Sequence, residues 1–387
     1  MKILFAADMS FNYFDKFQGK ERVKSLMAEA TQVFGQADFS MLNLENIFGD
    51  RENYTPMVKG GPNLISDAEF AEFLDVLKPT ALGLANNHCR DYGPEALMDT
   101  MELLKEKGYM LAGAGKNIEE GYIPVVFEKD GIRVAVITIC ENEHGFASED
   151  YAGSAGYHLT RLKEAINAAR DRGEIPMVYF HGGTEHNPIA SPGKVELYRH
   201  FIDIGAKAVI AMHTHCPQGY EMYQGCPIVY SMGNFFFPSG KSSREHKLWN
   251  FGYMTSLDVK ADGISMEIIP YHFDFDHFTL LKGEEKAYFM KYMAYLNETL
   301  TDKKRTKEYF DAWSLIRAQW LLPILNFTPD MFELGAPAMK TIKNIFCCEA
   351  HYEVVRNALT IIYDGRMEEA NQKRAAIETL QNYEIPK

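Results

Sequence analysis

The chain has 387 residues, of which 46% are hydrophobic and 13% aromatic, so it can bury a sizeable core and is not an intrinsically disordered protein. Its 40 lysine and arginine residues against 53 aspartate and glutamate residues give a net charge of −13. So acidic a surface repels phosphate backbones and excludes a nucleic-acid-binding protein, although metal ions or local cations would still allow an anionic substrate.

Short apolar runs alternate with amphipathic segments over the first two thirds of the chain. The apolar runs, rich in Val, Ile, Leu, Phe and Ala, predict buried strands, and the amphipathic segments predict helices. The predicted strands are Lys2–Ala7, Asp38–Leu42, Thr80–Ala85, Tyr109–Ala112, Ile132–Cys140, Ile175–Phe180 and Ala206–Met212. The predicted helices are Glu21–Phe34, Ser66–Leu77, Pro94–Lys107, Thr160–Arg172 and Pro192–Ile204. This alternation predicts a layered α/β fold with parallel strands.

Local signals mark the starts of several of these helices. Ser66 precedes two acidic residues, as a capping residue does. Pro94 suits a first helical turn, and Ser191 precedes a proline at the start of the last predicted helix. The segment Arg51–Leu64, which contains two prolines and two glycines, predicts a long loop with a functional role.

The pattern changes beyond Pro227. The predicted strands Pro227–Ser231, Tyr253–Val259 and Ile264–Pro270 have no helices between them, which indicates an antiparallel or mixed portion. From about Gly283 the chain is helical, which predicts a first domain of residues 1–282 and a helical extension of residues 283–387. Apolar residues recur in the extension at helical spacing and predict core or docking stripes rather than a ligand-binding cluster: Phe289, Met293, Leu296, Leu300, Trp313, Ile316, Trp320, Val355, Leu359 and Ile362.

The start of the chain and its cysteines bear on location. The apolar run from Met1 ends at Asp8, far short of a signal-peptide core or a membrane span. The six cysteines form no CxxC pair and no spacing typical of a disulfide scaffold. The sequence therefore predicts free thiols and a cytoplasmic protein.

Polar side chains gather where the predicted strands end. Five separate strands end in Asp8, Asn43-Leu44-Glu45, Asn86-Asn87-His88, His181 and His213-Thr214-His215. The carboxyl ends of parallel strands form the edge at which sites are built, so these side chains should converge if the strands are neighbours.

This set of residues suits two divalent metal ions. Carboxylates carry charge and can bridge two ions, while imidazoles and an amide oxygen complete each coordination sphere without excess negative charge. A metal pair can activate water and hold the attacking and leaving oxygens of a displacement at phosphorus. His88, one residue beyond Asn87, could stabilise the transition state or protonate the leaving oxygen, with Asp91 orienting its imidazole.

Each residue also has a purely structural interpretation. Asp8 alone could cap a helix, Asn43 could hold a turn, and His181 could be a hydrogen-bonded core histidine. His213 and His215 form the stronger pair, because alternate residues of a strand face the same side, and at a strand end both can reach one ion cluster.

Other residues next to these motifs lack a supporting pattern. Cys89 and Cys216 each lie beside a motif histidine but have no paired cysteine, so we expect them to be inert or to support the ligands. Four further histidines are expected on the surface or in loops: His144, His158, His186 and His200.

Several short motifs together resemble a known family. They are Asn43-Leu44-Glu45, Asn86-Asn87-His88-Cys89-Arg90-Asp91-Tyr92-Gly93, Gly113-Ala114-Gly115, His181-Gly182-Gly183-Thr184-Glu185, His213-Thr214-His215 and Tyr230-Ser231-Met232-Gly233-Asn234-Phe235. Their order and spacing up to about Phe237 resemble the bacterial capsule-synthesis CapA proteins, also called poly-γ-glutamate capsule biosynthesis proteins, of the calcineurin-like metallophosphatase superfamily.

The resemblance implies a four-layer α/β/β/α sandwich with a pair of Mn, Fe or Zn ions at one edge of its sheets. It implies one ion on Asp8, Glu45 and His215, the other on Glu45, Asn87, His181 and His213, and His88 as the catalytic imidazole supported by Asp91. General metallophosphatases carry a histidine where this chain has Ser10, and an aspartate motif where it has Asn43 and Glu45. CapA proteins look similar to this chain at both positions, so the resemblance to that family is unaffected.

The leading hypothesis for function is a metal-dependent, phosphoesterase-like hydrolase of an anionic small-molecule or polymer substrate. Asn43, Lys59 and Glu185 are expected to contact the substrate, with a plain surface lysine as the alternative for Lys59. A second hypothesis is a non-hydrolytic accessory protein for the synthesis or export of poly-γ-glutamate, in contact with the capsule-synthesis machinery. A third is amide hydrolysis at the same metals. The helical extension is expected to mediate homo-oligomerisation or to cap the sandwich, and family analogy would allow membrane association.

Overall fold

Two large β-sheets carry the fold of the computed structural model, which describes residues 1–14, 17–325, 328, 331 and 335–383. The first sheet has eight strands among the described residues, in the order β18-β17-β16-β1-β2-β5-β6, with β15 also paired to β1. Its strands are β1 (Lys2–Met9), β2 (Phe39–Leu44), β5 (Ala81–Gly83), β6 (Met110–Ala112), β15 (Asn234–Phe236), β16 (Phe251–Lys260), β17 (Gly263–Phe273) and β18 (Phe278–Leu280). The pairs among β1, β2, β5, β6 and β15 are parallel, and those of β16, β17 and β18 are antiparallel.

The second sheet has six described strands in the order β13-β14-β12-β11-β9-β8. They are β8 (Val125–Lys129), β9 (Ile132–Cys140), β11 (Ile175–His181), β12 (Val209–Met212), β13 (Tyr220–Tyr223) and β14 (Cys226–Val229). The four central strands are parallel, and antiparallel strands lie at both edges. Two short pairs, β3 (Ile47–Phe48) with β4 (Ile65–Ser66) and β7 (Ala114–Gly115) with β10 (Gly153–Ser154), lie in the loops.

The two sheets pack against each other, and strand β11 shows why. Its alternate residues Met177 and Tyr179 belong to the core shared with β1, whereas Val178 and Phe180 belong to the core under helices α6 (Leu159–Asp171) and α7 (Pro192–Asp203). Tyr179 donates a hydrogen bond from its hydroxyl to the backbone oxygen of Ala6, across the space between the sheets. The central strands of the second sheet are thus buried on both faces, which explains their nearly continuous apolar sequences.

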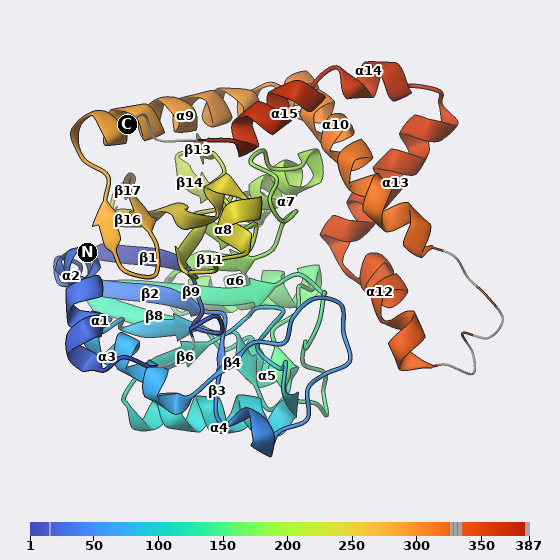
Figure 1. The fold of residues 1–387 in the computed structure, drawn as a ribbon. Helices are drawn as coiled ribbons and strands as arrows, with labels where there is room; N and C mark the ends of the chain where they lie inside the picture. Colours follow the sequence, from blue (N-terminus) through green and yellow to red (C-terminus); the bar gives the residue numbers. More distant parts are fainter. Residues whose placement is uncertain (15–16, 326–327, 329–330, 332–334, 384–387) are drawn as a thin grey trace.

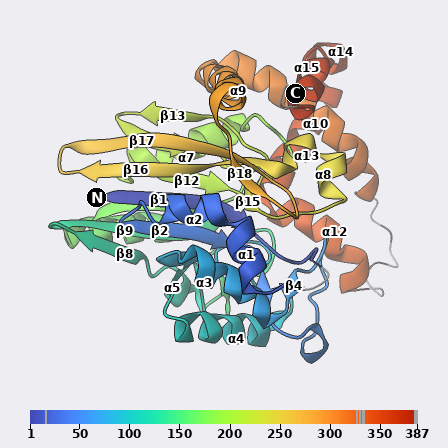
Figure 2. The same ribbon diagram turned by 60° about the vertical axis from the view of Figure 1, so that its left-hand side comes forward.

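Helices cover the sheets on several sides (Figures 1 and 2). On the first sheet and its loops lie α1 (Lys20–Leu26), α2 (Ala28–Phe34), η2 (Ala68–Ala71), α3 (Glu72–Leu77) and α4 (Gly93–Glu106). Shorter helices lie in connections: η1 (Arg51–Asn53), α5 (Ile118–Gly121), α8 (Ser242–Glu245) and η3 (Lys247–Asn250). The C-terminal helices are α9 (Gly283–Thr301), α10 (Lys303–Leu321), η4 (Leu322–Ile324), α12 (Ala336–Cys347), α13 (Glu349–Tyr363), α14 (Met367–Asn371) and α15 (Arg374–Gln381).

The sequence predicted this mixed α/β fold and most of its elements. Pro94 lies in the first turn of α4, and the side chain of Ser191 accepts a hydrogen bond from the backbone N–H of Lys194 at the start of α7, both as expected. The strand predicted to start at Ala206 begins only at Val209. Strands β8, β13, β15 and β18 were not predicted.

Two predicted helices differ in the structure. The helix predicted for Glu21–Phe34 is broken at Met27, because α1 packs on α3 while α2 packs on β18. Ser66 does not cap a helix: it lies in strand β4, and its hydroxyl donates to the side-chain oxygen of Asn46. Tertiary partners, rather than local propensity, decide both cases.

The apolar stripes of the C-terminal helices are only partly as predicted. The α9 residues Phe289 and Met293 are fully buried in the core that contains the first sheet. Trp320, however, is 73% exposed. On α13 the predicted stripe is wrong by one residue at two positions: Leu359 and Ile362 are exposed, and the buried face is Val354, Val355, Ala358 and Ile361. Among the described residues, no helix is long and apolar enough to cross a membrane.

Candidate metal centre

The strand ends of both sheets meet at one place. Asp8 near the end of β1 lies in register with Asn43 on β2 and with Asn234 on β15. Strands β11 and β12 of the other sheet bring His181 and the turn after Met212 to the same edge. Within the described part of the chain, two groups of buried side chains have ligand atoms within 4.8 Å of one another: Glu45, His181 and His213, and Asp8, Glu45 and His215.

Glu45 lies at the middle of this cluster. Its side chain is fully buried, and neither carboxylate oxygen has a hydrogen-bond partner among the described residues. Oε1 is 3.7 Å from Nε2 of His88 and 4.0 Å from Nε2 of both His181 and His215. Burial, together with the charge of Asp8, raises the pKa of Glu45 well above its ordinary value. A buried carboxylate with no hydrogen bond is stabilised when it binds a cation.

The unpaired oxygens of Glu45 and the surrounding imidazoles fit divalent metal ions. Two bonds of about 2.0–2.2 Å to one ion span separations of this size, and carboxylates and imidazoles bind such ions together. Burial lowers the pKa of His181 to about 4, and it also lowers the pKa of His215. Both rings are therefore neutral near pH 7, as metal binding requires.

Asp8 is held in place by its neighbours. One oxygen accepts from Nδ2 of Asn43 at 2.7 Å, and the other accepts from the backbone N–H of His213 at 2.9 Å. Burial opposes its ionisation, but the nearby His181 imidazole, 3.3 Å away, helps to hold the pKa of Asp8 below its ordinary value. Asn43 thus holds Asp8 and does not only stabilise a turn.

His213 and His215 reach the centre by a different route from the one predicted. They lie beyond the end of β12, in a turn where their φ angles are 99° and 54°. Non-glycine residues with positive φ are uncommon and concentrate at functional sites. The two rings therefore converge at the end of the strand, as predicted, but they do so through a left-handed turn and not by alternating along the strand.

Asn87 and His181 lie on one side of Glu45. Nε2 of His181 is 3.1 Å from Oδ1 of Asn87 and 2.9 Å from Nδ1 of His213. Its Nδ1 is 3.2 Å from Nδ2 of Asn43. With Asp8 counted, His181 is thus in contact with four other polar residues of the cluster and is not an isolated core histidine.

His88 and Asp91 lie close together, and Lys59 joins them. Nδ1 of His88 is 2.6 Å from Oδ2 of Asp91, and the Lys59 ammonium is 2.5 Å from Oδ1 of Asp91 and 3.0 Å from Nδ1 of His88. The side chain of Lys59 is 1% exposed, so it is not a surface lysine. The loop of residues 51–64 therefore carries a buried cation to the centre.

Sequence reasoning missed Glu143 and the contribution of Asn234. Glu143 follows β9, and its Oε2 accepts from Nδ2 of Asn87 at 2.8 Å and lies 3.9 Å from Nε2 of His213. The run Glu141-Asn142-Glu143 is the same kind of polar strand end that identified the other residues, so this signal was available. Oδ1 of Asn234 is 2.8 Å from Nδ1 of His215 and fixes that ring.

Other predicted residues lie around the cluster. The Glu185 carboxylate makes no hydrogen bond to another described residue. Burial raises the pKa of Glu185, but the charges of neighbouring histidines, of which His186 has the largest effect, keep that pKa below its ordinary value. His186 and His144 are in loops as expected but adjoin the centre: His186 stacks on His246 with ring centroids 3.6 Å apart, and Nε2 of His144 is 4.0 Å from Glu143. Ser10 donates to Asn46.

Cys89 and Cys216 are expected to resist alkylation in the native protein. Both are buried, and burial raises the pKa of each thiol to about 12. With a pKa of about 12, only about one molecule in ten thousand carries the thiolate at either position at pH 8. Alkylation is therefore slow, because the thiolate is the reactive form. Iodoacetamide followed by mass spectrometry should label the partly exposed Cys347 first. Labelling of Cys89 or Cys216 at the rate of Cys347 would contradict their assignment as inert.

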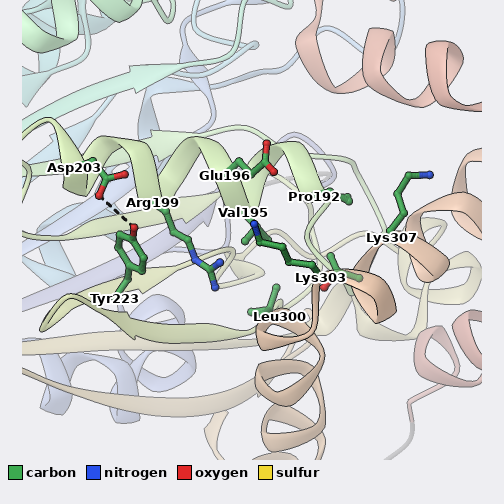
Figure 3. Close-up of a pocket in the computed structure, with 10 residues that line it drawn as sticks. Pro192, Val195, Glu196, Arg199, Asp203, Tyr223, Leu300, Lys303 and Lys307 are labelled. Atoms are coloured by element: carbon green, nitrogen blue, oxygen red, sulfur yellow. Dashed lines mark hydrogen bonds between the residues drawn. The ribbon is translucent and has the colours of Figure 1, made fainter.

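Two cavities are relevant to the candidate metal centre, one of them apart from it and the other next to it. One cavity, of about 430 Å³, lies between α7, β13 and the α9–α10 junction. Figure 3 shows Arg199, Asp203, Tyr223 and Lys303 among the residues that line it. These residues are distinct from the predicted site. A cavity of about 240 Å³ adjoins the centre and is lined by His186, Cys216, His246, Trp313, Arg317 and residues of α15. The C-terminal helices therefore form a wall next to the cluster.

The chain is similar in sequence to known bacterial capsule-synthesis proteins. Residues 3–239 match the family model described as bacterial capsule synthesis protein PGA_cap. The capsule biosynthesis protein CapA of Bacillus anthracis is 29% identical over 212 residues, which cover 53% of this chain and 51% of that protein. The PGA biosynthesis protein CapA of Bacillus subtilis is 26% identical over 235 residues, 60% of this chain and 62% of that protein. A Mycobacterium tuberculosis protein named as a probable polyglutamine synthesis accessory protein is 29% identical over 178 residues, 42% of this chain and 46% of that protein. The match thus spans between about half and three fifths of these relatives.

Proposed function

The chain belongs to the bacterial capsule synthesis protein family, and from this premise we propose that it is a metal-dependent, phosphoesterase-like hydrolase. One observation carries the proposal: the Glu45 carboxylate is fully buried without a hydrogen bond, and three imidazole Nε2 atoms lie 3.7–4.0 Å from one of its oxygens. Asp8 and His215 would hold one ion with Glu45. Asn87, His181 and His213 would hold the other with Glu45.

The metals, proposed as a pair of Mn, Fe or Zn ions, would supply activated water and charge stabilisation for a displacement at phosphorus when bound. The protein supplies the orientation. Asp91 and Lys59 occupy the Nδ1 side of the His88 ring, which leaves Nε2 facing the cluster. From there His88 can donate a proton to a leaving oxygen.

The predicted substrate contacts divide into two kinds. Asn43 and Lys59 are occupied by Asp8 and Asp91, so we propose that they act mainly by holding those carboxylates. Glu185 makes no hydrogen bond within the described residues and is the member of the three that is available to a ligand. We also propose that the two packed sheets and their helices form the four-layer sandwich of calcineurin-like metallophosphatases, with residues 1–282 as that domain and 283–387 as an extension.

The direct test combines metal analysis with turnover. We expect the purified protein to hold Mn, Fe or Zn and to hydrolyse p-nitrophenyl phosphate or bis(p-nitrophenyl) phosphate. Replacing both His88 and His213 by alanine should lower turnover by at least about a hundredfold. His277→Ala, whose side chain is 75% exposed, is the matched control and should leave it unchanged. Turnover that survives the double substitution would rule out this mechanism.

A second candidate function is favoured by the names of the relatives, which refer to capsule and PGA biosynthesis and to an accessory protein. In it the chain binds poly-γ-glutamate or the capsule-synthesis machinery without hydrolysis, and the same metals hold carboxylates of the polymer. Binding of poly-γ-glutamate that depends on His213, without turnover of either chromogenic ester, would favour this function over hydrolysis.

A further inference from the structure

The C-terminal helices reach the metal centre through Glu143. Asn344 on α12 donates from Nδ2 to Oε1 of Glu143 at 3.2 Å. Nδ1 of His351 on α13 lies 3.3 Å from Oδ1 of Asn344. The other oxygen of Glu143 accepts from Asn87. A continuous series of side-chain contacts thus joins residues of the extension to a proposed metal ligand.

The direction of these contacts matters for Asn87. A side-chain amide has one donor end and one acceptor end, and its neighbours decide which end points where. Because Glu143 accepts from Nδ2 of Asn87, the amide oxygen of Asn87 must face His181 and the cluster. That oxygen is the end that can bind a metal ion. The same logic applies to Asn344, whose donor end is turned towards Glu143.

Helix α13 is fixed to the two loops that carry the centre. Glu349 accepts from the backbone N–H of Asn142 at 3.0 Å and from its side chain at 2.7 Å. Glu353 accepts from the Ser191 hydroxyl at 2.7 Å and from the backbone N–H of Gly193 at 3.1 Å. One loop follows β9 and the other follows β11, so α13 is anchored independently of Asn344 on both sides.

We propose that Asn344 is a positioning residue that orients Glu143 and, through it, the Asn87 amide, so that the C-terminal extension completes the metal centre. The inference rests on the proposed metal-dependent function. It adds that helices α12 and α13 are part of the site's construction and not only a cover for the sheets. Outer partners of metal ligands commonly change metal affinity by about 10–100-fold.

The test exploits the donor–acceptor logic. In Asn344→Asp the donor to Glu143 becomes a second carboxylate, so the Mn²⁺ affinity measured by titration calorimetry should fall by about 10–100-fold. In the double variant Asn344→Asp with Glu143→Gln, the amide introduced at position 143 can donate to the carboxylate introduced at position 344 and still accept from Asn87. The double variant should therefore bind Mn²⁺ at least tenfold more tightly than Asn344→Asp alone. Mere packing damage would not be rescued in this way.

The matched control lies within the same extension. Asn357 donates at 2.9 Å to both Asp311 and Ser314, away from the cluster, so Asn357→Asp should leave Mn²⁺ affinity within twofold of wild type. If Asn344→Asp does not fold, Asn344→Ala is measured with the same readout. An unchanged affinity in a folded Asn344 variant, or no recovery in the double variant, would overturn this inference alone. Absence of Mn²⁺ binding by the wild type would overturn the proposed function with it.

Discussion

Glu45→Gln is expected to abolish the stabilisation of the protein by metal ions. Both candidate ligand groups share this carboxylate, so neutralising it weakens each of them. At a Mn²⁺ concentration of 100 times the dissociation constant, each site stabilises the wild type by about 2.7 kcal/mol. A thousandfold weaker site would contribute only about 0.06 kcal/mol at that concentration. Thermal or urea unfolding with Mn²⁺, and with a chelator as the reference, measures the difference.

Without metal ions, Glu45→Gln is expected to raise the stability of the protein and not to lower it. Without a cation, the buried Glu45 carboxylate has no hydrogen-bond partner among the described residues, and a charge in that position opposes folding. The metal-free Glu45→Gln variant should therefore be more stable than the metal-free wild type. Glu298→Gln, on a side chain that is 73% exposed, is the matched control and should change neither result. Equal Mn²⁺ stabilisation of wild type and Glu45→Gln would remove Glu45 from the centre.

Lys194→Met is expected to lower the free energy of unfolding by about 3–5 kcal/mol, because it leaves a buried carboxylate without its cation. The side chains of Lys194 and Glu141 are 6% and 4% exposed and form an ion pair. Glu141 also accepts from the backbone N–H of Gly183 at 2.6 Å, in the loop that leads to Glu185. The pair therefore links helix α7 to a loop of the centre. Urea denaturation measures the loss.

Two further variants separate charge from packing. Adding Glu141→Gln to Lys194→Met removes the uncompensated charge and should recover part of the stability. Lys282→Met breaks a pair with Glu29 at the surface, where Lys282 is 67% exposed, and should cost less than about 1 kcal/mol. A loss for Lys194→Met no larger than that of Lys282→Met would show that the buried pair contributes little.

The candidate cluster could be predicted because its signals are local. Asp8, Glu45, His181 and His213 each follow a short apolar run, and the rule that parallel strands present their carboxyl ends at one edge links them. Glu143 follows β9 in the same manner and was within reach of the same argument.

The remaining features depend on contacts between distant parts of the chain. Lys59 is buried because its loop folds back onto Asp91, and no pattern in the loop encodes that. The contact of Asn344 with Glu143 joins residues 201 positions apart. The left-handed turn at His213 and His215 was missed for another reason: neither residue is a glycine, so nothing local marked it.

The position of Asn344 in the chain has a consequence for biosynthesis. Translation proceeds at about 5–20 residues per second, so the stretch from His215 to His351 takes on the order of ten seconds to emerge from the ribosome. During that interval the candidate metal-binding residues have been synthesised, but the helix that carries Asn344, whose side chain donates to Glu143, has not. Loading of the proposed metal ions is therefore expected to follow the synthesis of the C-terminal helices.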